Sequence, residues 1–230
     1  IISVMKSIQL SPNSLNLFLE CPHCFWLYKN MGIKRPPQYP YVLNLAVDAL
    51  LKEEFDTYRS KKIPHPLLKE SNIKAHLFKN QKLLNQWRSN LAGIRYFDED
   101  LQATLFGVVD DILEFEDGKL APLDYKSTGN LITKVYDRFQ FQLDTYTFLL
   151  EKNGYDTAKK GYIAFYIVDK SRGFIDRLPF RKEIIEIETN PLDIYDIFKD
   201  AVIVLRKETP PEHSIDCRFK EWLDNVKKFN

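Results

Sequence analysis

Residues 107–127 read GVVDDILEFEDGKLAPLDYKS, and this stretch predicts the β-hairpin on which the fold depends. From Gly107 to Phe115, polar and apolar residues alternate well enough for a strand, and valine, isoleucine and phenylalanine favour extended backbone. Asp117-Gly118 is typical of a hairpin turn, and the returning strand runs from Leu120 to Ser127. The sequence therefore predicts two antiparallel strands joined by a tight turn.

The register of this hairpin decides which carboxylate lies across from Asp124. Asp124 and Lys126 are two residues apart, so both side chains leave the same face of their strand. A three-residue loop with Gly118 in the left-handed conformation sets Asp110 opposite Asp124. A two-residue turn sets Asp111 there instead. With either register, two carboxylates and one amine converge on one patch of sheet.

Such a group of charges suits the hydrolysis of phosphodiester bonds. Two carboxylates can hold a divalent metal, which activates water and offsets charge on the phosphate. Hard oxygen ligands favour Mg²⁺ or Mn²⁺ over zinc, and a nearby lysine can orient the attacking water. The alternative is a solvated hairpin face that carries ordinary surface charges.

Four motifs, in the same order along the chain, resemble the PD-(D/E)XK nuclease superfamily, and within it the RecB-type branch and the related CRISPR-adaptation exonucleases. Residues 107–110 (GVVD) and 123–127 (LDYKS) are similar to the second and third motifs of the superfamily. Gln142 and Tyr146 match the Gln-x-x-x-Tyr signature of that branch. Residues 10–27 match its typical opening, a short helix that ends in Cys-Pro before an aromatic helix.

The resemblance implies a restriction-endonuclease-like α/β core, in which a central mixed β-sheet is flanked by helices on both sides. By the same resemblance, Asp110 and Asp124 are metal ligands, and the Tyr125 carbonyl adds a third oxygen. Lys126 is then the catalytic lysine, and it acts together with both aspartates. The implied cofactor is Mg²⁺ or Mn²⁺, and the implied substrate is DNA, as single strands or duplex ends.

The upstream metal ligand of the family differs in this chain. The RecB-type pattern is a glycine followed four residues later by a histidine, and Asn44 and Asp48 stand at those places here. Asp48 is therefore expected to be a third carboxylate ligand. The alternative is an amphipathic helix over residues 42–58 that leaves Asp48 and Lys52 in solvent. Its buried positions are then Leu45, Leu51 and Phe55.

Gln142 and Tyr146 are four residues apart, which stacks them on one face of a helix expected over residues 136–152. Arg138 extends this face by one turn. We expect these three side chains to bind the DNA backbone, with Tyr146 stacking or hydrogen bonding. The alternative is that they form a helix edge with satisfied polar tips.

The remaining patterns predict one domain over residues 1–230, with a helical amino-terminal portion (about 10–90) and a helical carboxy-terminal tail (about 191–230). Predicted helices cover residues 11–20, 22–29, 42–58, 136–152 and 191–206, with a further mostly helical segment between 63 and 90. Predicted strands lie near residues 93–97, 103–115, 120–127 and 161–168, with an extended return to about 188.

Charge is nearly balanced, with 33 lysines and arginines against 32 acids. This excludes the strong basic excess of many nonspecific DNA-binding proteins. Basic residues nevertheless gather in residues 59–88 and 159–182, which would suit a track for the phosphate backbone. No stretch is long and apolar enough for a membrane span and no signal-peptide pattern is present, so a cytoplasmic protein without membrane partners is expected.

The three cysteines have the spacing of metal ligands, since Cys21 and Cys24 are three apart and Cys217 lies far downstream. Some relatives hold an iron–sulfur cluster with one early and three late cysteines, but three cysteines cannot supply four thiolates. A structural zinc site that adds His213 or His23 is chemically feasible. Three reduced thiols are the favoured interpretation.

Three functions follow from these patterns. The first is a divalent-metal-dependent DNA nuclease, expected to be an exonuclease in DNA repair, recombination or CRISPR adaptation. The second is a catalytically silent DNA-binding module. The third is an accessory subunit of a helicase or integrase complex, because the chain has no Walker-type glycine loop of its own.

Overall fold

The structure is a computed structural model that describes residues 7–36, 42–130, 136–174 and 176–227. Contacts divide the chain into two compact units. Unit 1 comprises residues 1–40, 97–105 and 193–230, and unit 2 comprises residues 41–96 and 106–192. The expectation of a single domain stays a prediction. No helix among the described residues is both long and apolar enough to cross a membrane.

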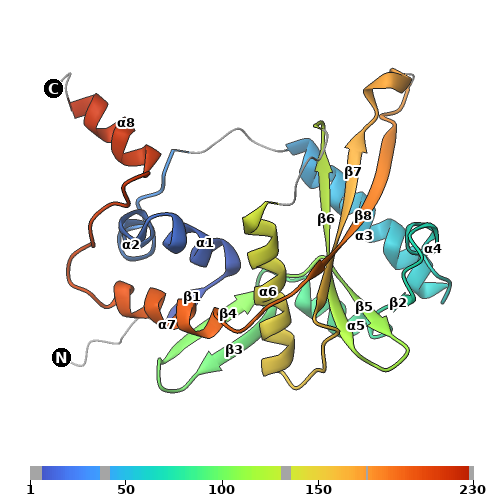
Figure 1. Ribbon diagram of the computed structural model, residues 1–230, viewed down its shortest axis with the longest axis horizontal. Helices are drawn as coiled ribbons and strands as arrows, with labels where there is room; N and C mark the ends of the chain where they lie inside the picture. Colours follow the sequence, from blue (N-terminus) through green and yellow to red (C-terminus); the bar gives the residue numbers. More distant parts are fainter. Residues whose placement is uncertain (1–6, 37–41, 131–135, 175, 228–230) are drawn as a thin grey trace. The chain divides into compact units, whose positions relative to one another are not determined.

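Unit 2 is built on a five-stranded sheet with the strand order β2-β5-β6-β7-β8 (Figure 1). The central strands β6 and β7 are parallel, and the other neighbours are antiparallel, so the sheet is mixed as predicted. The strands are β2 Ala75–Leu77, β5 Asp111–Phe115, β6 Leu120–Thr128, β7 Lys160–Val168 and β8 Phe180–Glu188. A short 3-10 helix, η1 (Lys170–Arg172), follows β7.

The hairpin β5–β6 adopts the three-residue-loop register. Phe115 N–H donates to the Lys119 carbonyl at 2.9 Å, and Gly118 has a φ of 82°, the left-handed conformation that glycine adopts without strain. Asp111 pairs with Leu123 in the ladder. The same register, carried one residue further, sets Asp110 opposite Asp124.

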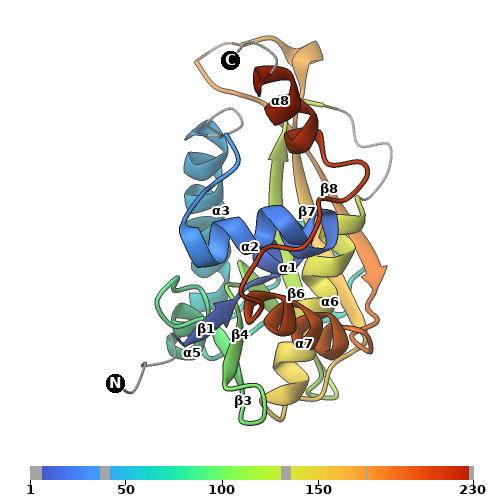
Figure 2. The same ribbon diagram turned by 90° about the vertical axis from the view of Figure 1, so that its left-hand side faces the viewer.

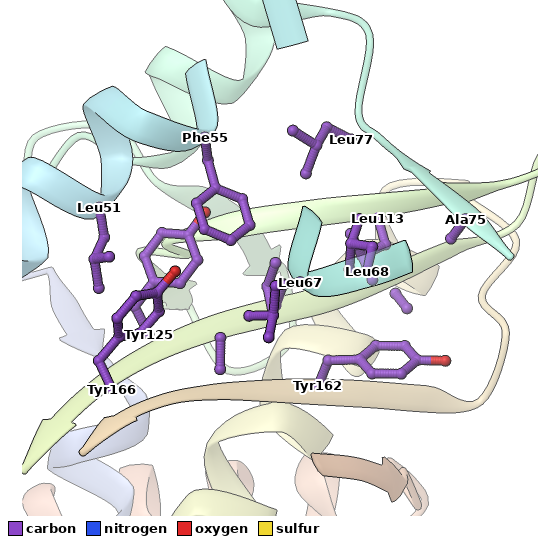
Figure 3. Close-up of a cluster of buried hydrophobic side chains, with 13 residues drawn as sticks. Leu51, Phe55, Leu67, Leu68, Ala75, Leu77, Leu113, Tyr125, Tyr162 and Tyr166 are labelled. Atoms are coloured by element: carbon purple, nitrogen blue, oxygen red, sulfur yellow. The ribbon is translucent and has the colours of Figure 1, made fainter. Parts of the chain in front are cut away.

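Helices cover both faces of this sheet, which confirms the predicted layering (Figure 1). Helix α6 (Asp137–Lys152) connects β6 to β7 and packs on one face through Leu143 and Leu149, both buried. Helices α3 (Val42–Ser60) and α4 (Pro66–Glu70) cover the other face. Figure 3 shows the core on that side, which contains Leu51, Phe55, Leu67, Leu68, Leu113, Tyr125 and Tyr162.

Leu45 is 70% exposed, so its expected burial on the amphipathic helix is wrong. Leu51 and Phe55 lie further along α3, where it packs on β6 through the cluster in Figure 3. The first turns of α3 instead flank a pocket at the end of β6, and Leu45 is one of its lining residues. Helical periodicity gives the direction of a side chain, but not how far the opposing surface extends.

The single strand predicted over residues 103–115 is wrong, because it is divided into β4 (Ala103–Gly107) and β5. Between them the backbone bonds with the end of helix α5 (Gln81–Trp87), where Val109 N–H donates to the Trp87 carbonyl at 3.3 Å. Gly107, the last residue of β4, allows α6 to pack closely, because a Cβ there would lie 2.8 Å from Leu149 and 2.9 Å from the Tyr146 ring. Sequence patterning also missed β2, which lies within the segment predicted as mostly helical, residues 63–90. Strand β2 pairs with β5.

Unit 1 has a small helical core formed by α1 (Pro12–Glu20), α2 (Pro22–Met31) and α7 (Ile194–Leu205) (Figure 2). Ser11 caps α1, since its hydroxyl accepts from Ser14 N–H. Strand β1 (Ile8–Leu10) is parallel to β4 in a sheet with the order β1-β4-β3, where β3 is Ile94–Asp98. Helix α8 (Arg218–Lys227) ends the described chain.

Candidate active site

A pocket in unit 2 lies between the start of α3, the end of β6 and the start of α6. Seven of the eight residues predicted for the site line it: Asp48, Asp110, Asp124, Tyr125, Lys126, Arg138 and Gln142. The eighth, Tyr146, lies beneath it in the interior. The structure therefore brings residues from three separate segments of the chain to one place.

Asp124 is the most buried carboxylate of the pocket, with 3% of its surface exposed. Its Oδ1 accepts from Gln142 Nε2 at 3.0 Å, and its Oδ2 is ion-paired with the Lys126 ammonium. Burial raises the pKa of Asp124 to about 7, and the neighbouring Asp110 charge adds to the rise while Lys126 opposes it. A cation beside Asp124 would relieve this penalty.

Asp110 lies at the break between β4 and β5, directly before the hairpin ladder begins. Its Oδ2 accepts from Tyr125 N–H at 2.9 Å, and its Oδ1 lies 2.9 Å from the ammonium of Lys52. Asp110 is thus fixed against β6 on one side and toward α3 on the other.

Lys52 lies beside the pocket, and its ammonium contacts two of the carboxylates that line it. Sequence reasoning named it only in the alternative that leaves Asp48 and Lys52 in solvent. Its Nζ lies 2.7 Å from Asp48 Oδ2, in addition to its contact with Asp110, so one ammonium bridges carboxylates from α3 and the hairpin. Burial lowers the pKa of Lys52, but the Asp110 and Asp48 charges outweigh this and raise it. The spacing from Asp48 to Lys52, one helical turn, was the available signal. Asp48 and Asp110 are close enough to share one cation.

Gln142 and Tyr146 connect Asp124 to the protein interior through hydrogen bonds. The Tyr146 hydroxyl donates to the Val108 carbonyl at 2.7 Å and accepts from Gln142 Nε2 at 2.7 Å. Tyr146 is 4% exposed, and burial, with the Asp124 charge, raises its pKa well above the ordinary value. The hydroxyl therefore stays protonated, and the chain of bonds Val108–Tyr146–Gln142–Asp124 orients the carboxylate.

The rim of the pocket carries aromatic and cationic side chains from the start of α6. The guanidinium of Arg138 lies over the rings of Tyr136 and Phe139, at 5.3 and 4.9 Å from their centroids. Lys126 Nζ lies 5.3 Å from the Phe139 centroid, so Phe139 separates the two cations. Arg138 is exposed, whereas Lys126 is half-buried.

Asn44 connects the first turns of α3 to the end of β6 through hydrogen bonds. Its Nδ2 donates to the Ser127 carbonyl at 2.6 Å and lies 2.9 Å from the Ser127 hydroxyl. This pair holds the first turns of α3 beside the strand that carries Asp124 and Lys126. Nothing in the sequence alone indicated the pairing, because the two residues are 83 apart.

Asp111, the other candidate partner of Asp124, faces the opposite side of the sheet. It is fully buried and ion-paired with Arg59 and with Arg88, whose Nη2 lies 3.1 Å from Asp111 Oδ2. The Tyr125 hydroxyl donates to the same carboxylate at 2.7 Å. Tyr125 therefore contacts Asp110 through its backbone and Asp111 through its side chain, so this network supports the pocket from behind.

This network removes two arginines from the phosphate track expected over residues 59–88. Arg59 is 7% exposed as a residue, and the side chain of Arg88 is 10% exposed. Both form ion pairs inside the protein, so neither belongs to a surface track for phosphates. In the second segment, several cations have acidic partners, as in the pairs Lys159–Glu151, Lys160–Glu186 and Lys182–Glu54.

The mixed sheet and the pocket place two aspartates and a lysine of one hairpin together, a set of side chains that can hold a divalent metal beside a phosphodiester bond. A family model, the PD-(D/E)XK nuclease superfamily, matches residues 41–219. The chain belongs to this superfamily, whose members are in general nucleases that use divalent metals.

Among solved structures, the chain is similar to one titled "Crystal structure of SSO0001", with 15% sequence identity and a TM-score of 0.45. The similarity covers 92% of this chain and 82% of that chain. No curated protein matches the chain.

Proposed function

We propose that this protein is a divalent-metal-dependent DNA nuclease of the RecB-type branch. It hydrolyses phosphodiester bonds as an exonuclease, in DNA repair, recombination or CRISPR adaptation. The observation that carries the proposal is the convergence of Asp48, Asp110 and Asp124 with Lys126 in one pocket. The pair Gln142 and Tyr146 within α6, which matches the Gln-x-x-x-Tyr signature of that branch, supports the finer assignment.

In this proposal, Asp48, Asp110 and Asp124, together with the Tyr125 carbonyl, hold Mg²⁺ or Mn²⁺. Two observations support the fit. The Lys52 ammonium already lies between Asp48 and Asp110, as a cation would. Asp124 Oδ2 is buried and, apart from its ion pair with Lys126, accepts no hydrogen bond of normal geometry from the residues that the structure describes. When bound, the metal supplies Lewis acidity that activates water and offsets charge on the phosphate.

Lys126 is the catalytic lysine of the proposal. It is half-buried between Asp124 and the Phe139 ring, which holds its ammonium at the pocket and gives it few alternative positions. From there it orients the attacking water and stabilises negative charge that develops on the phosphate.

The α6 side chains divide between two roles. Arg138 lies exposed at the rim, where its guanidinium contacts the DNA backbone. Gln142 and Tyr146 were expected to bind DNA as well, but the burial of Tyr146 and its bonds to Val108 and Gln142 favour a positioning role. Both act through Asp124, whose carboxylate they orient.

The test is cleavage of end-labelled single- and double-stranded DNA with Mg²⁺, Mn²⁺ or EDTA. Metal-dependent cutting is expected for the native protein and for Lys119→Ala, a matched lysine at the other end of the hairpin, and not for Lys126→Ala. The product ladder gives the polarity. Full activity of a metal-replete Asp124→Asn protein would contradict the site assignment.

A second candidate function is a catalytically silent DNA-binding module, which serves as an accessory subunit of a helicase or integrase complex. Lys52 favours it, because an internal ammonium between Asp48 and Asp110 can take the place of a metal. Asp48 in the place of the family histidine points the same way. DNA binding that weakens with salt, without cleavage under any metal, would support this candidate over the nuclease.

A further inference from the structure

Unit 1 contains a second group of metal-ligating side chains, which the proposed nuclease chemistry does not use. The sulfur atoms of Cys21, Cys24 and Cys217 and a ring nitrogen of His213 all lie within 4.8 Å of one another. Cys21 stands between α1 and α2, and Cys24 lies in the first turn of α2. His213 and Cys217 belong to the segment between α7 and α8, about 190 residues away in the sequence.

Three separations in this group fit the edges of a tetrahedron around one ion, and all four ligand atoms lie within 4.8 Å of one another. Cys24 Sγ lies 3.6 Å from Cys217 Sγ, and His213 Nδ1 lies 3.5 Å from Cys21 Sγ and 3.9 Å from Cys24 Sγ. Zinc bonds of about 2.3 Å to sulfur and about 2.0 Å to nitrogen give tetrahedral edges of about 3.8 Å between sulfurs and about 3.5 Å between sulfur and nitrogen. The sulfur separation is also far too long for a disulfide, and all three cysteines are free.

The surroundings are those of a closed, structural site. All three cysteines are buried, and Leu17 and Phe219 pack against them. The His213 ring is stacked on His23, with centroids 3.7 Å apart, and His23 Nδ1 lies 2.7 Å from the Pro211 carbonyl. Stacking and the bond to Pro211 hold the His213 ring with its nitrogen toward the sulfurs. Thiols that only filled a core would not need a histidine nitrogen aimed at them.

We propose that Cys21, Cys24, His213 and Cys217 bind one Zn²⁺ ion, which fastens the α1–α2 corner to the segment before α8. Three sulfurs and one imidazole are a complete ligand set for structural zinc. An iron–sulfur cluster fits less well, because it takes four thiolates spread over several iron atoms, and only three thiols lie here at the spacing of a single ion. This site does not depend on the nuclease proposal.

The first test is the metal content of the purified full-length protein, measured by mass spectrometry. About one zinc per chain is expected. Cys217→Ser and His213→Ala should retain zinc at least about tenfold less well under a chelator challenge, because each removes a ligand. His76→Ala, at an exposed histidine of β2, should retain it fully. His23→Ala should keep the ion too, since His23 only stacks on the ligand.

A second measurement, on the native protein, tests the site even if the cysteine variants do not fold. The native protein is loaded with Co²⁺ in place of zinc, and the expected spectrum combines sulfur-to-cobalt charge transfer with the intense visible bands of a tetrahedral site. The three thiols should resist a disulfide reagent until a chelator is added. Stoichiometric iron with sulfide, or thiols that react equally fast with and without zinc, would overturn the proposal.

Discussion

The pocket of unit 2 and the cysteine cluster of unit 1 contrast in almost every chemical respect. The pocket offers carboxylate oxygens, lies open at its rim and carries the cations Lys126 and Arg138, while the Lys52 ammonium contacts two of its carboxylates. The cluster offers three sulfurs and one imidazole, is closed by apolar side chains and is buried. Oxygen ligands suit Mg²⁺ or Mn²⁺, and thiolates suit zinc. One chain can therefore keep an exchangeable metal and a structural metal apart through ligand type alone.

The largest expected effect is a loss of stability in unit 2, without loss of zinc from unit 1, when Asp111 is replaced. Asp111→Ala leaves Arg59 and Arg88 without their buried partner, which should lower the free energy of unfolding by about 3–5 kcal/mol. Urea denaturation measures this loss. Asp117→Ala, in the exposed turn of the same hairpin, is the control and should change little. If zinc content falls in step with stability, then the two regions are coupled and the contrast fails.

Lys126→Ala is expected to slow DNA cleavage by about 10²–10³-fold, as does the loss of one group that stabilises charge in a transition state. The measurement is single-turnover cleavage at saturating metal. Zinc content and the circular dichroism spectrum should not change, because Lys126 lies in the pocket and the cysteines lie in unit 1. Cleavage at the native rate would remove Lys126 from the catalytic group.

Lys52→Met tests whether a metal can replace the Lys52 ammonium between Asp48 and Asp110 in the pocket of unit 2. Without its ammonium, Asp48 and Asp110 lose their shared cation, which should cost about 1–2 kcal/mol of stability in EDTA, since the group is partly exposed. Saturating Mg²⁺ or Mn²⁺ should restore most of this loss if the same carboxylates bind the metal. Thermal denaturation in both conditions provides the measurement. A loss that metal leaves unchanged would argue for the silent-module candidate.

The smallest effect is expected for Tyr146→Phe, which removes only a hydroxyl. The Val108 carbonyl and Gln142 each lose a partner, so a loss of about 1 kcal/mol in stability is expected, with roughly tenfold slower cleavage. DNA affinity should stay the same, because Tyr146 is buried.

Arg138→Ala should show the reverse, weaker DNA binding with little change in the cleavage rate at saturating DNA. Weaker DNA binding by Tyr146→Phe would restore its expected role as a DNA contact.

Sequence reasoning succeeded where contacts are local. The helices at residues 12–20, 42–60 and 137–152 follow from apolar periodicity and caps, and the hairpin follows from one Asp-Gly turn. It failed where a distant element decides the outcome. Strand β2 exists because Leu77 pairs with Leu113, and the long predicted strand breaks because its backbone bonds to the end of α5 instead of a neighbour.

Two residues show the same limit within the candidate site. The turn pattern alone left open whether Asp110 or Asp111 faces Asp124, and only the family resemblance favoured Asp110. The register of the folded hairpin sets Asp110 there, and two arginines hold Asp111 behind the sheet. Lys52 appeared only in the alternative that leaves it in solvent, because its helix position alone suggests exposure. Its role depends on Asp110, a residue 58 positions away that no periodicity connects to it.

By itself, the sequence determined the superfamily, the hairpin and the set of residue types available for chemistry, because these depend on short spacings along the chain. Only the tertiary structure decided which of those residues meet. It turned Asp111 into the interior, brought Lys52 between two carboxylates, and joined Cys21 and Cys24 to His213 and Cys217. The physical reason is that side-chain contacts between distant segments are set by the packing of whole elements, which local patterns do not contain.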